Sequence, residues 1–363
     1  MNAIDDLKKV GTSTWLDDLS RDRLTSGNLK ELLSSKSIVG VTTNPSIFAA
    51  AMGKGTAYDE QIGELKQSGS SVDDGVYTMA IKDVQDACDL FAEIYKESDG
   101  KDGRVSIEVD PRISADRDAT LTQAKNLWER VNRPNVMIKI PATQGSMPAI
   151  SDALAEGISV NVTLIFSVPV YRSVVAAYID GIKRAAENGH DVSKIHSVAS
   201  FFVSRVDTEV DKRLDAIGTP EALALKGKAG IANAHRAYAA FEDLFKDADL
   251  PEGAHVQRPL WASTGVKNSD YPQDMYVTEL AGPDTVNTMP EKTRKAVAES
   301  AELHGDAVSA NIGEAHQVFA ALAEAGIDFS AVSRQLLDEG VKKFEVAWEE
   351  LLASVKEALA ASK

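Results

Sequence analysis

Short runs of β-branched and aliphatic residues alternate with longer stretches of helical spacing along this chain of 363 residues. Eight runs predict strands, at 12–17, 38–43, 104–109, 136–140, 158–163, 196–200, 258–263 and 284–288. Helical patterns occupy 28–36, 73–98, 114–132, 146–156, 168–188, 203–216, 220–248, 290–301 and 308–324. Because parallel strands need crossover helices, this alternation predicts an α/β fold of βαβ units. Eight units favour a closed TIM (β/α)8 barrel over an open sheet.

The end of the chain predicts one long amphipathic helix near 333–361. Its apolar positions recur every three or four residues, at Leu337, Val341, Phe344, Trp348, Leu351 and Val355. We expect this helix to pack over the barrel, and a partner-binding helix is the less favoured alternative. The segment 219–257 is interpreted as an extra helical excursion before the seventh strand. No linker or repeat divides the chain, so we expect a single domain over 1–363.

The predicted strands carry apolar side chains on one face and polar ones on the other. In the third strand, Val105 and Ile107 share one face, whereas Ser106 and Glu108 share the opposite face. The aliphatic face can pack on the surrounding helices, while the polar groups gather toward the carboxyl ends, where such barrels build their active sites. We therefore expect convergence on one pocket of Asp17, Asn44, Glu108, Lys139, Asn161 and Thr163.

Lys139 is the most informative of these residues because it interrupts the apolar run 136–140. A buried ammonium group costs several kcal/mol unless it is paired or neutral. Desolvation and nearby cations can lower the pKa of a lysine, and a neutral amine can attack a carbonyl to form a Schiff base. Asp17 and Glu108 are candidates for the proton transfers that cleavage of a carbon–carbon bond in a sugar requires.

Structural roles remain alternatives for two of these residues. Lys139 could form an ion pair with Glu108 or Asp110 that serves only stability. Asn44 precedes Pro45, and an asparagine in that position commonly caps a helix. The catalytic interpretation is favoured because polar groups recur on several strands together.

Composition narrows the partners that the surface can bind. The chain has 39 lysines and arginines against 55 acidic residues, a formal net charge of −16. This balance argues against nucleic-acid or anionic-membrane binding, although a local basic pocket can still hold a small anion.

The N-terminus lacks an apolar leader pattern and no run resembles a membrane span, so we expect a cytoplasmic protein. Cys88 is the single cysteine, and its helical surroundings predict a buried side chain.

Motifs for competing chemistries are absent. The 6 histidines form no close ligand pair, so we expect no metal site. The chain also has no G-x-S-x-G nucleophile elbow, no P-loop and no dinucleotide-binding G-x-G-x-x-G after a strand. The sequence leaves both a homodimer and a monomer open.

Five motifs together resemble the transaldolase family, which belongs to the class I Schiff-base aldolases. They are GVTTNPSIF (40–48), RVSIEVDPR (104–112), VMIKIPATQG (136–145), GISVNVTLIFS (157–167) and SVASFFVSRVD (197–207). A sixth stretch, ELAGPDTVNTMP (279–290), is similar to the longer subgroup of bacterial and plant type. The resemblance implies the TIM-barrel fold. It also implies an enzyme of the pentose phosphate pathway that transfers a dihydroxyacetone unit between phosphorylated sugars and needs no cofactor.

The resemblance also implies roles for individual residues. Lys139 matches the Schiff-base lysine, and Asp17 matches the aspartate that deprotonates the C4 hydroxyl of the sugar. Glu108 matches the acid and base that acts through a water, and Thr163 matches the threonine that positions this water.

Substrate-binding residues follow from the same motifs. Asn44 and Asn161 match asparagines around the bound ketose, and Ser200 and Phe202 match residues that line the donor pocket. Arg205 matches a phosphate-binding arginine. Shorter family members place a second phosphate-binding arginine after the seventh strand, where this chain instead offers Lys267, which would supply charge without the bidentate fork.

Phe202 separates two activities on this scaffold. Related lyases, which cleave fructose 6-phosphate to free dihydroxyacetone, carry a tyrosine at this position, and its hydroxyl helps to place the catalytic water. Phe202 lacks that hydroxyl, so the resemblance favours transfer to an aldehyde acceptor. A non-catalytic sugar-phosphate binding protein is the third possibility, although it would be expected to lack the lysine or one of the acids.

Overall fold

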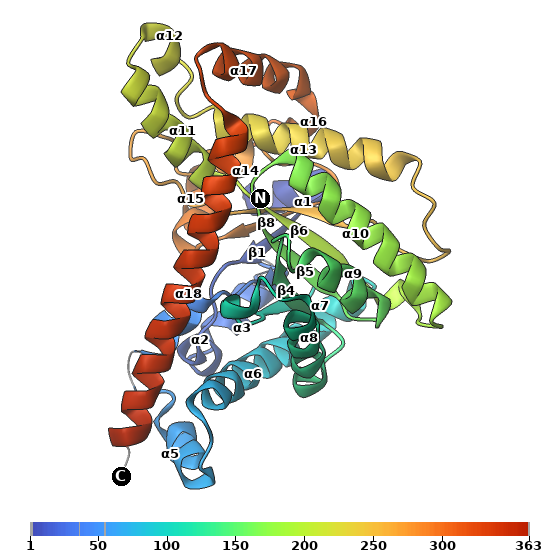
Figure 1. Cartoon of the computed structure of the whole chain (residues 1–363), viewed down its shortest axis with the longest axis vertical. Helices are drawn as coiled ribbons and strands as arrows, with labels where there is room; N and C mark the ends of the chain where they lie inside the picture. Colours follow the sequence, from blue (N-terminus) through green and yellow to red (C-terminus); the bar gives the residue numbers. More distant parts are fainter. Residues whose placement is uncertain (1–2, 36, 54–55, 362–363) are drawn as a thin grey trace.

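Eight parallel strands close into a barrel in sequence order, from β1 to β8 (Figure 1). The structure is a computed structural model that describes residues 3–35, 37–53 and 56–361. Each strand overlaps one of the predicted runs, so the predicted TIM barrel is confirmed. The strands are β1 Thr12–Leu16, β2 Gly40–Val41, β3 Arg104–Glu108, β4 Val136–Pro141, β5 Val160–Ile165, β6 Ser197–Phe202, β7 Arg258–Ala262 and β8 Thr285–Met289.

Helices surround the barrel and extend beyond it at both ends (Figure 1). They are α1 Ala3–Val10, α2 Arg21–Thr25, α3 Asn28–Ser34, α4 Pro45–Met52, α5 Asp59–Ser68, α6 Val72–Leu90, α7 Ala92–Glu97, α8 Arg117–Val131, α9 Met147–Ala155, α10 Val168–Glu187, α11 Ser204–Ile217, α12 Pro220–Leu223, α13 Ala229–Lys246, α14 Met275–Thr278, α15 Glu291–Ser300, α16 Ala307–Ala310, α17 Ile312–Glu324 and α18 Phe329–Ala361, with 3₁₀ turns η1 Pro111–Ile113 and η2 Val192–Lys194. Among these described helices, none combines the length and the apolar character that a membrane crossing requires.

Several predictions about helices are wrong. The pattern 73–98 divides into α6 and α7, and the pattern 308–324 divides into α16 and α17. The pattern 220–248 predicts one helix, but the chain breaks into α12 and α13, with Gly227 at a φ of 73° in the left-handed region that favours glycine. The segment is also no excursion, because α13 packs against α10, β7 and α17 and belongs to the layer that covers the barrel.

Several short helices were not predicted, and α4 had clear signals. Asn44 caps it by accepting a hydrogen bond from the Ile47 amide at 3.1 Å, and Pro45 occupies its first position. The helix is hydrophobic nearly all round, so it lacks the one-sided pattern on which the prediction relied.

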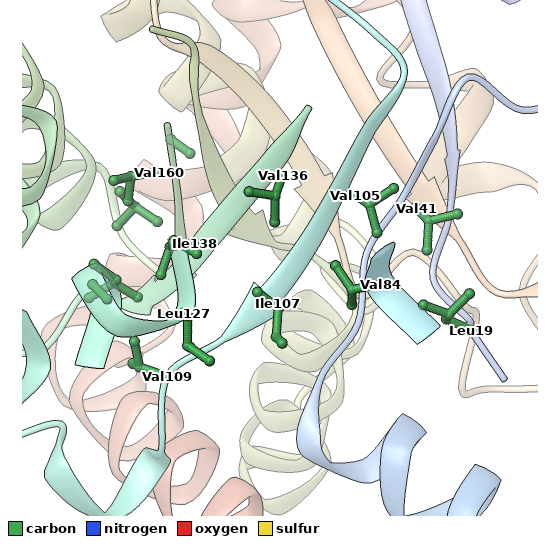
Figure 2. Packing of buried hydrophobic residues seen from close by; sticks show 14 of the residues in the cluster. Leu19, Val41, Val84, Val105, Ile107, Val109, Leu127, Val136, Ile138 and Val160 are labelled. Atoms are coloured by element: carbon green, nitrogen blue, oxygen red, sulfur yellow. The ribbon is translucent and has the colours of Figure 1, made fainter. Parts of the chain in front are cut away.

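The outward faces of the first five strands carry the aliphatic residues that alternation predicted. Val105 and Ile107 of β3 and Val136 and Ile138 of β4 are buried beneath Leu127 of α8, among other helical residues (Figure 2). The single cysteine, Cys88, is buried in the same cluster, as expected. Burial on this face leaves the opposite face of each strand to fill the barrel.

The interior of the barrel is closed at the amino ends of the strands. Apolar side chains fill its middle, namely Trp15, Met137, Val198, Leu260 and Val286. Below them Asp102 accepts hydrogen bonds from Ser13 Oγ at 2.8 Å and from Trp15 Nε1 at 3.2 Å, and it pairs with Arg258 at 3.2 Å. Polar groups at the carboxyl ends therefore face a cavity with a solid floor.

Helix α18 runs along the molecule and packs against α4, α5, α6 and α11 (Figure 1). The predicted packing over the barrel is confirmed, and Phe344, Trp348, Leu351 and Val355 are buried. The first part of the helix differs from the prediction. The helix begins at Phe329 and buries Leu336 and Gly340, whereas the predicted apolar positions Leu337 and Val341 are only partly buried. The apolar face rotates along this long helix, so two predicted positions move to its edge.

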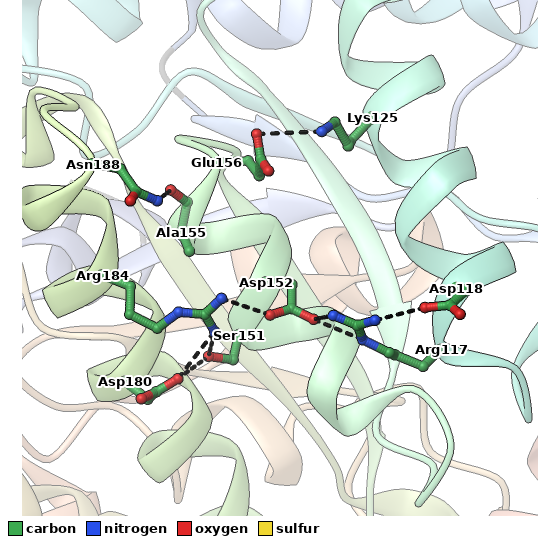
Figure 3. A network of polar contacts seen from close by, with 10 residues as sticks. All are labelled: Arg117, Asp118, Lys125, Ser151, Asp152, Ala155, Glu156, Asp180, Arg184 and Asn188. Atoms are coloured by element: carbon green, nitrogen blue, oxygen red, sulfur yellow. Dashed lines mark hydrogen bonds and ion pairs between the residues drawn. The ribbon is translucent and has the colours of Figure 1, made fainter.

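An ion-pair network ties three outer helices together (Figure 3). Asp152 of α9 pairs with Arg117 of α8 on one side and with Arg184 of α10, at 2.8 Å, on the other. Arg184 also pairs with Asp180 of its own helix at 3.3 Å. One buried carboxylate thus fixes the spacing of the helices that cover β4 and β5.

Candidate active site

A cavity of about 140 Å³ opens at the carboxyl ends of the strands. Eight of the ten predicted site residues line it, namely Asp17, Asn44, Lys139, Thr163, Ser200, Phe202, Arg205 and Lys267. The other two, Glu108 and Asn161, are buried in the barrel immediately beside lining residues. The remaining lining residues are Thr42, Ala262, Ser263, Gly265, Thr288, Pro290, Lys343 and Phe344.

Lys139 points into the barrel between two polar neighbours. Strand register places Glu108 of β3 on one side and Asn161 of β5 on the other. Its Nζ donates a hydrogen bond to the Thr43 carbonyl at 2.9 Å and lies 3.4 Å from Glu108 Oε2. The side chain is only 5% exposed, so the amine is held in place and shielded from bulk water. Asp110, the other partner considered from sequence, instead binds Arg112 outside the cavity.

Glu108 is buried beside this amine. Burial raises the pKa of its carboxyl from 4.5 to about 7, although Lys139 opposes the shift. A carboxyl group with a pKa near neutrality can both give and take a proton. Its Oε2 has no hydrogen-bond partner among the described residues, and neither has Thr163 Oγ1. Both oxygens are thus buried polar atoms without a hydrogen bond in the described part of the chain, in a residue that lines the cavity and in one that lies beside it.

Asp17 follows β1 and is oriented by two threonines. Thr42 Oγ1 donates to Asp17 Oδ1 at 2.7 Å and lies 2.6 Å from Thr288 Oγ1. Burial raises the pKa of Asp17, while Lys139 and the Thr42 hydroxyl lower it. The two threonines were not predicted, although Thr42 lies on the polar face of the second predicted strand.

The side chains of Asn161 and Asn44 form hydrogen bonds that hold neighbouring parts of the site in place. Asn161 accepts a hydrogen bond from Ser200 Oγ at 2.7 Å and donates to Ser106 Oγ at 3.1 Å. It therefore positions Ser200 and does not line the cavity itself. The sequence allowed Asn44 either a helix cap or a place in the pocket. In the structure it has both roles, because it caps α4 and lines the cavity.

One side of the cavity is strongly basic. Arg205 is half-buried at the start of α11, and its guanidinium lies 5.1 Å from the Phe202 ring. Lys267, from the segment after β7, lines the same cavity, as predicted. Lys343 of α18 joins them and was missed, because nothing in the pattern of a long amphipathic helix indicates that it crosses the mouth of the barrel. Phe344, read from sequence as a core residue, has its ring centroid 5.9 Å from Lys139 Nζ.

The described residues contain no group of three or more histidine, cysteine, aspartate or glutamate side chains that could hold a metal ion. The cavity and its immediate surroundings offer the Lys139 amine, the carboxyl groups of Asp17 and Glu108, and the cations of Arg205, Lys267 and Lys343. Fold and site together define a TIM-barrel protein with a buried lysine at the carboxyl end of its fourth strand.

Comparisons with known proteins give the family. The model of the transaldolase/fructose-6-phosphate aldolase family matches residues 14–355. A transaldolase of Mycolicibacterium smegmatis is 59% identical over 361 residues, which cover 98% of this chain and 97% of that protein. A transaldolase of Mycobacterium tuberculosis H37Rv is 57% identical over 355 residues, covering 96% and 95% respectively. This chain belongs to the transaldolase/fructose-6-phosphate aldolase family.

Proposed function

We propose that this protein is a transaldolase. It transfers a dihydroxyacetone unit from sedoheptulose 7-phosphate to glyceraldehyde 3-phosphate and forms erythrose 4-phosphate and fructose 6-phosphate. The observation that carries the proposal is the buried amine of Lys139, 3.4 Å from Glu108 and in one cavity with Asp17 and Arg205. The transaldolase names of relatives that match nearly the whole chain support the same reaction.

Lys139 is the nucleophile in this proposal. Its neutral amine attacks the ketone carbon C2 of the donor, and loss of water from the carbinolamine leaves a protonated Schiff base. Asp17 takes the proton of the C4 hydroxyl, the C3–C4 bond breaks, and its electron pair moves into the enamine. The aldose phosphate leaves, and the enamine then attacks the acceptor aldehyde, whose oxygen receives the proton.

Glu108 and Thr163 act on the water molecule that is released when the Schiff base forms and consumed when it is hydrolysed. Each has a side-chain oxygen without a hydrogen-bond partner among the described residues, and Glu108 has a pKa of about 7. Glu108 delivers a proton to the departing hydroxyl during dehydration and takes one from water during hydrolysis, while Thr163 orients that water. Ser200, held by Asn161, contacts the bound ketose together with Asn44.

Arg205 and Lys267 bind the phosphate group. The dihydroxyacetone unit carries no phosphate, so the phosphate belongs to the aldose that leaves and to the acceptor that replaces it. A basic side of the cavity therefore serves donor and acceptor alike. Arg205 can present a planar fork to the phosphate oxygens, and Lys267 adds a point charge.

Borohydride trapping tests the nucleophile. Reduction in the presence of fructose 6-phosphate should add a dihydroxyacetone-derived mass to the peptide that contains Lys139. The Lys139→Ala variant should show no adduct and no turnover while its thermal unfolding stays cooperative. An adduct on another lysine, or activity in this variant, would contradict the assignment.

A lyase on the same scaffold is the second candidate, since the family model covers both activities. The side chain that favours the transferase is Phe202, which lines the cavity and offers no hydroxyl to a hydrolytic water. We expect conversion of fructose 6-phosphate to be at least tenfold faster with erythrose 4-phosphate than without an acceptor. Equal rates, with release of free dihydroxyacetone, would favour the lyase.

A further inference from the structure

The basic side of the cavity holds three cations that reach it from three separate segments. Arg205 stands at the start of α11, Lys267 follows β7, and Lys343 belongs to α18. None of them takes part in an ion pair within 4 Å among the described residues. The chain carries a net charge of −16, so acidic partners are abundant elsewhere on its surface. Three unpaired cations around one cavity therefore mark a place for an anion.

The three charges lie close enough to oppose one another. Repulsion from Arg205, then burial, then Lys267 lowers the pKa of Lys343. Asp17, Glu108 and Glu339 favour the charge of Arg205 at longer range, although burial lowers its pKa. None of these carboxylates forms an ion pair with the three cations in the described structure. This arrangement costs free energy in the unliganded protein, and a bound dianion would relieve that cost.

Close approach of α18 places Lys343 there. A Cβ atom on Gly340 would lie 3.0 Å from Leu164 Cδ2 and 3.6 Å from an Arg205 guanidinium nitrogen. The helix backbone therefore passes directly beside Arg205, and the next turn presents Lys343 and Phe344 to the cavity. Phe344 is buried at 3% exposure and anchors this turn.

We propose that Lys343 is a specificity-determining residue whose ammonium group contacts the substrate phosphate opposite Arg205, so that α18 completes the phosphate site. This inference rests on the proposed function, because it assigns the anion to the phosphate group of the sugar. An arginine fork holds the phosphate from α11, while two lysines from other segments add charge without demanding a fixed geometry. Recognition of phosphorylated over neutral sugars then depends on a residue outside the barrel.

Steady-state kinetics of Lys343→Ala in the full chain test this assignment. We expect the KM for fructose 6-phosphate to rise about three- to tenfold with kcat within about twofold, since the exposed Lys343 charge contributes to ground-state binding. The inhibition constant of inorganic phosphate should rise by a similar factor. With unphosphorylated D-glyceraldehyde as acceptor, the KM for the acceptor should stay unchanged, and Lys343→Arg should recover most of the lost affinity.

Lys342→Ala is the matched control because it removes the same charge from the adjacent position, where Lys342 pairs with Glu345 at 3.3 Å. It should leave all these constants unchanged. Unchanged KM and phosphate inhibition in Lys343→Ala would overturn the inference, as would an equal loss with phosphorylated and unphosphorylated acceptors, which would indicate a structural role. Failure of the proposed function looks different, because the wild-type protein would then form no borohydride adduct with fructose 6-phosphate.

Discussion

Burial changes what individual side chains can do, and Glu108 is the clearest case. The carboxyl group keeps one oxygen 3.4 Å from the Lys139 amine, yet desolvation outweighs that attraction and brings its pKa to about 7. Asp17, whose pKa is also raised, receives a hydrogen bond from Thr42 that Glu108 lacks. Burial thus raises the pKa of both carboxyl groups. Besides Lys139, which opposes the shift in both, the Thr42 hydroxyl opposes it at Asp17.

The raised pKa of Glu108 makes stability depend on pH. The pKa is about 7 in the folded state against 4.5 for an exposed glutamate, so the folded protein binds more protons between these values. The contribution of this group is fully present below pH 4.5 and is lost as pH rises through 7, by up to about 3 kcal/mol of unfolding free energy. Denaturant unfolding measured at pH 5 and at pH 8 gives the free energy of unfolding at each pH. Between pH 5 and pH 8 this free energy should fall less for Glu108→Gln than for wild type. Equal decreases would contradict the raised pKa.

Thr42 is expected to position Asp17 without touching the substrate. Thr42→Val keeps the shape of the side chain but removes the 2.7 Å hydrogen bond to the carboxylate. Hydrogen bonds to charged groups contribute about 1.5–3 kcal/mol, so kcat should fall about tenfold or more. The lost bond should also raise the pKa of Asp17 further and move the acid limb of the kcat profile upward. Thr42→Ser should restore both properties, and an unchanged profile in Thr42→Val would argue against this role.

At the scale of the element, close packing between neighbouring strands inside the barrel depends on a single glycine in β2. The short strand β2 contributes Gly40, whose missing side chain makes room for the Trp15 ring. That ring is fully buried and is tied to Asp102 by its indole nitrogen. The part of the cavity floor that Trp15 forms is therefore packed directly against the backbone of Gly40.

Gly40→Ala should therefore destabilise the protein. The new Cβ would lie 2.6–2.7 Å from three atoms of the Trp15 ring, which cannot move without breaking its own contacts. Overpacking of this kind costs about 1–3 kcal/mol and should lower the urea midpoint and the Tm. Gly313→Ala is the control, because nothing lies within 4 Å of its Cβ position in helix α17. It should leave the Tm equal or slightly higher, and a Gly40→Ala variant that behaved like it would contradict the packing argument.

At the scale of the whole molecule, α18 joins the end of the chain to the barrel and to the site. Trp348 packs on Tyr77 of α6 with ring centroids 4.9 Å apart, and the Tyr77 hydroxyl donates to the Glu108 carbonyl at 3.4 Å. One face of α18 thus holds the outer helices while Lys343 and Phe344 reach the cavity.

Removal of the Trp348 side chain should cost stability on the scale of a core truncation. Trp348→Ala leaves a cavity between α18 and α6, and such changes cost about 3–5 kcal/mol, which a fall in Tm and in the denaturant midpoint would report. Val346→Ala on the same helix removes a side chain that is 40% exposed and should change stability by less than about 0.5 kcal/mol. Equal effects of the two substitutions would mean that α18 is not docked in this way.

Periodicity in the sequence was enough to predict all eight strands, the inward direction of Lys139 and Glu108, and four of the six buried positions expected on the last helix. Each of these depends on which face of a single element is apolar, and that information is local. The break at Gly227 and the helix α4 were missed for the same reason, since one glycine or an all-apolar helix barely disturbs a periodic pattern.

The chain alone specified the elements, their apolar faces and the chemistry-bearing residues at the strand ends, because spacing and residue type express those properties directly. Closure of the barrel was needed to bring Asp17 and Lys139 to one cavity with Glu108 buried beside them, and docking of α18 was needed to add Lys343 and Phe344 to it. Contacts between residues two hundred positions apart depend on how all the elements pack together, and no local pattern carries that information.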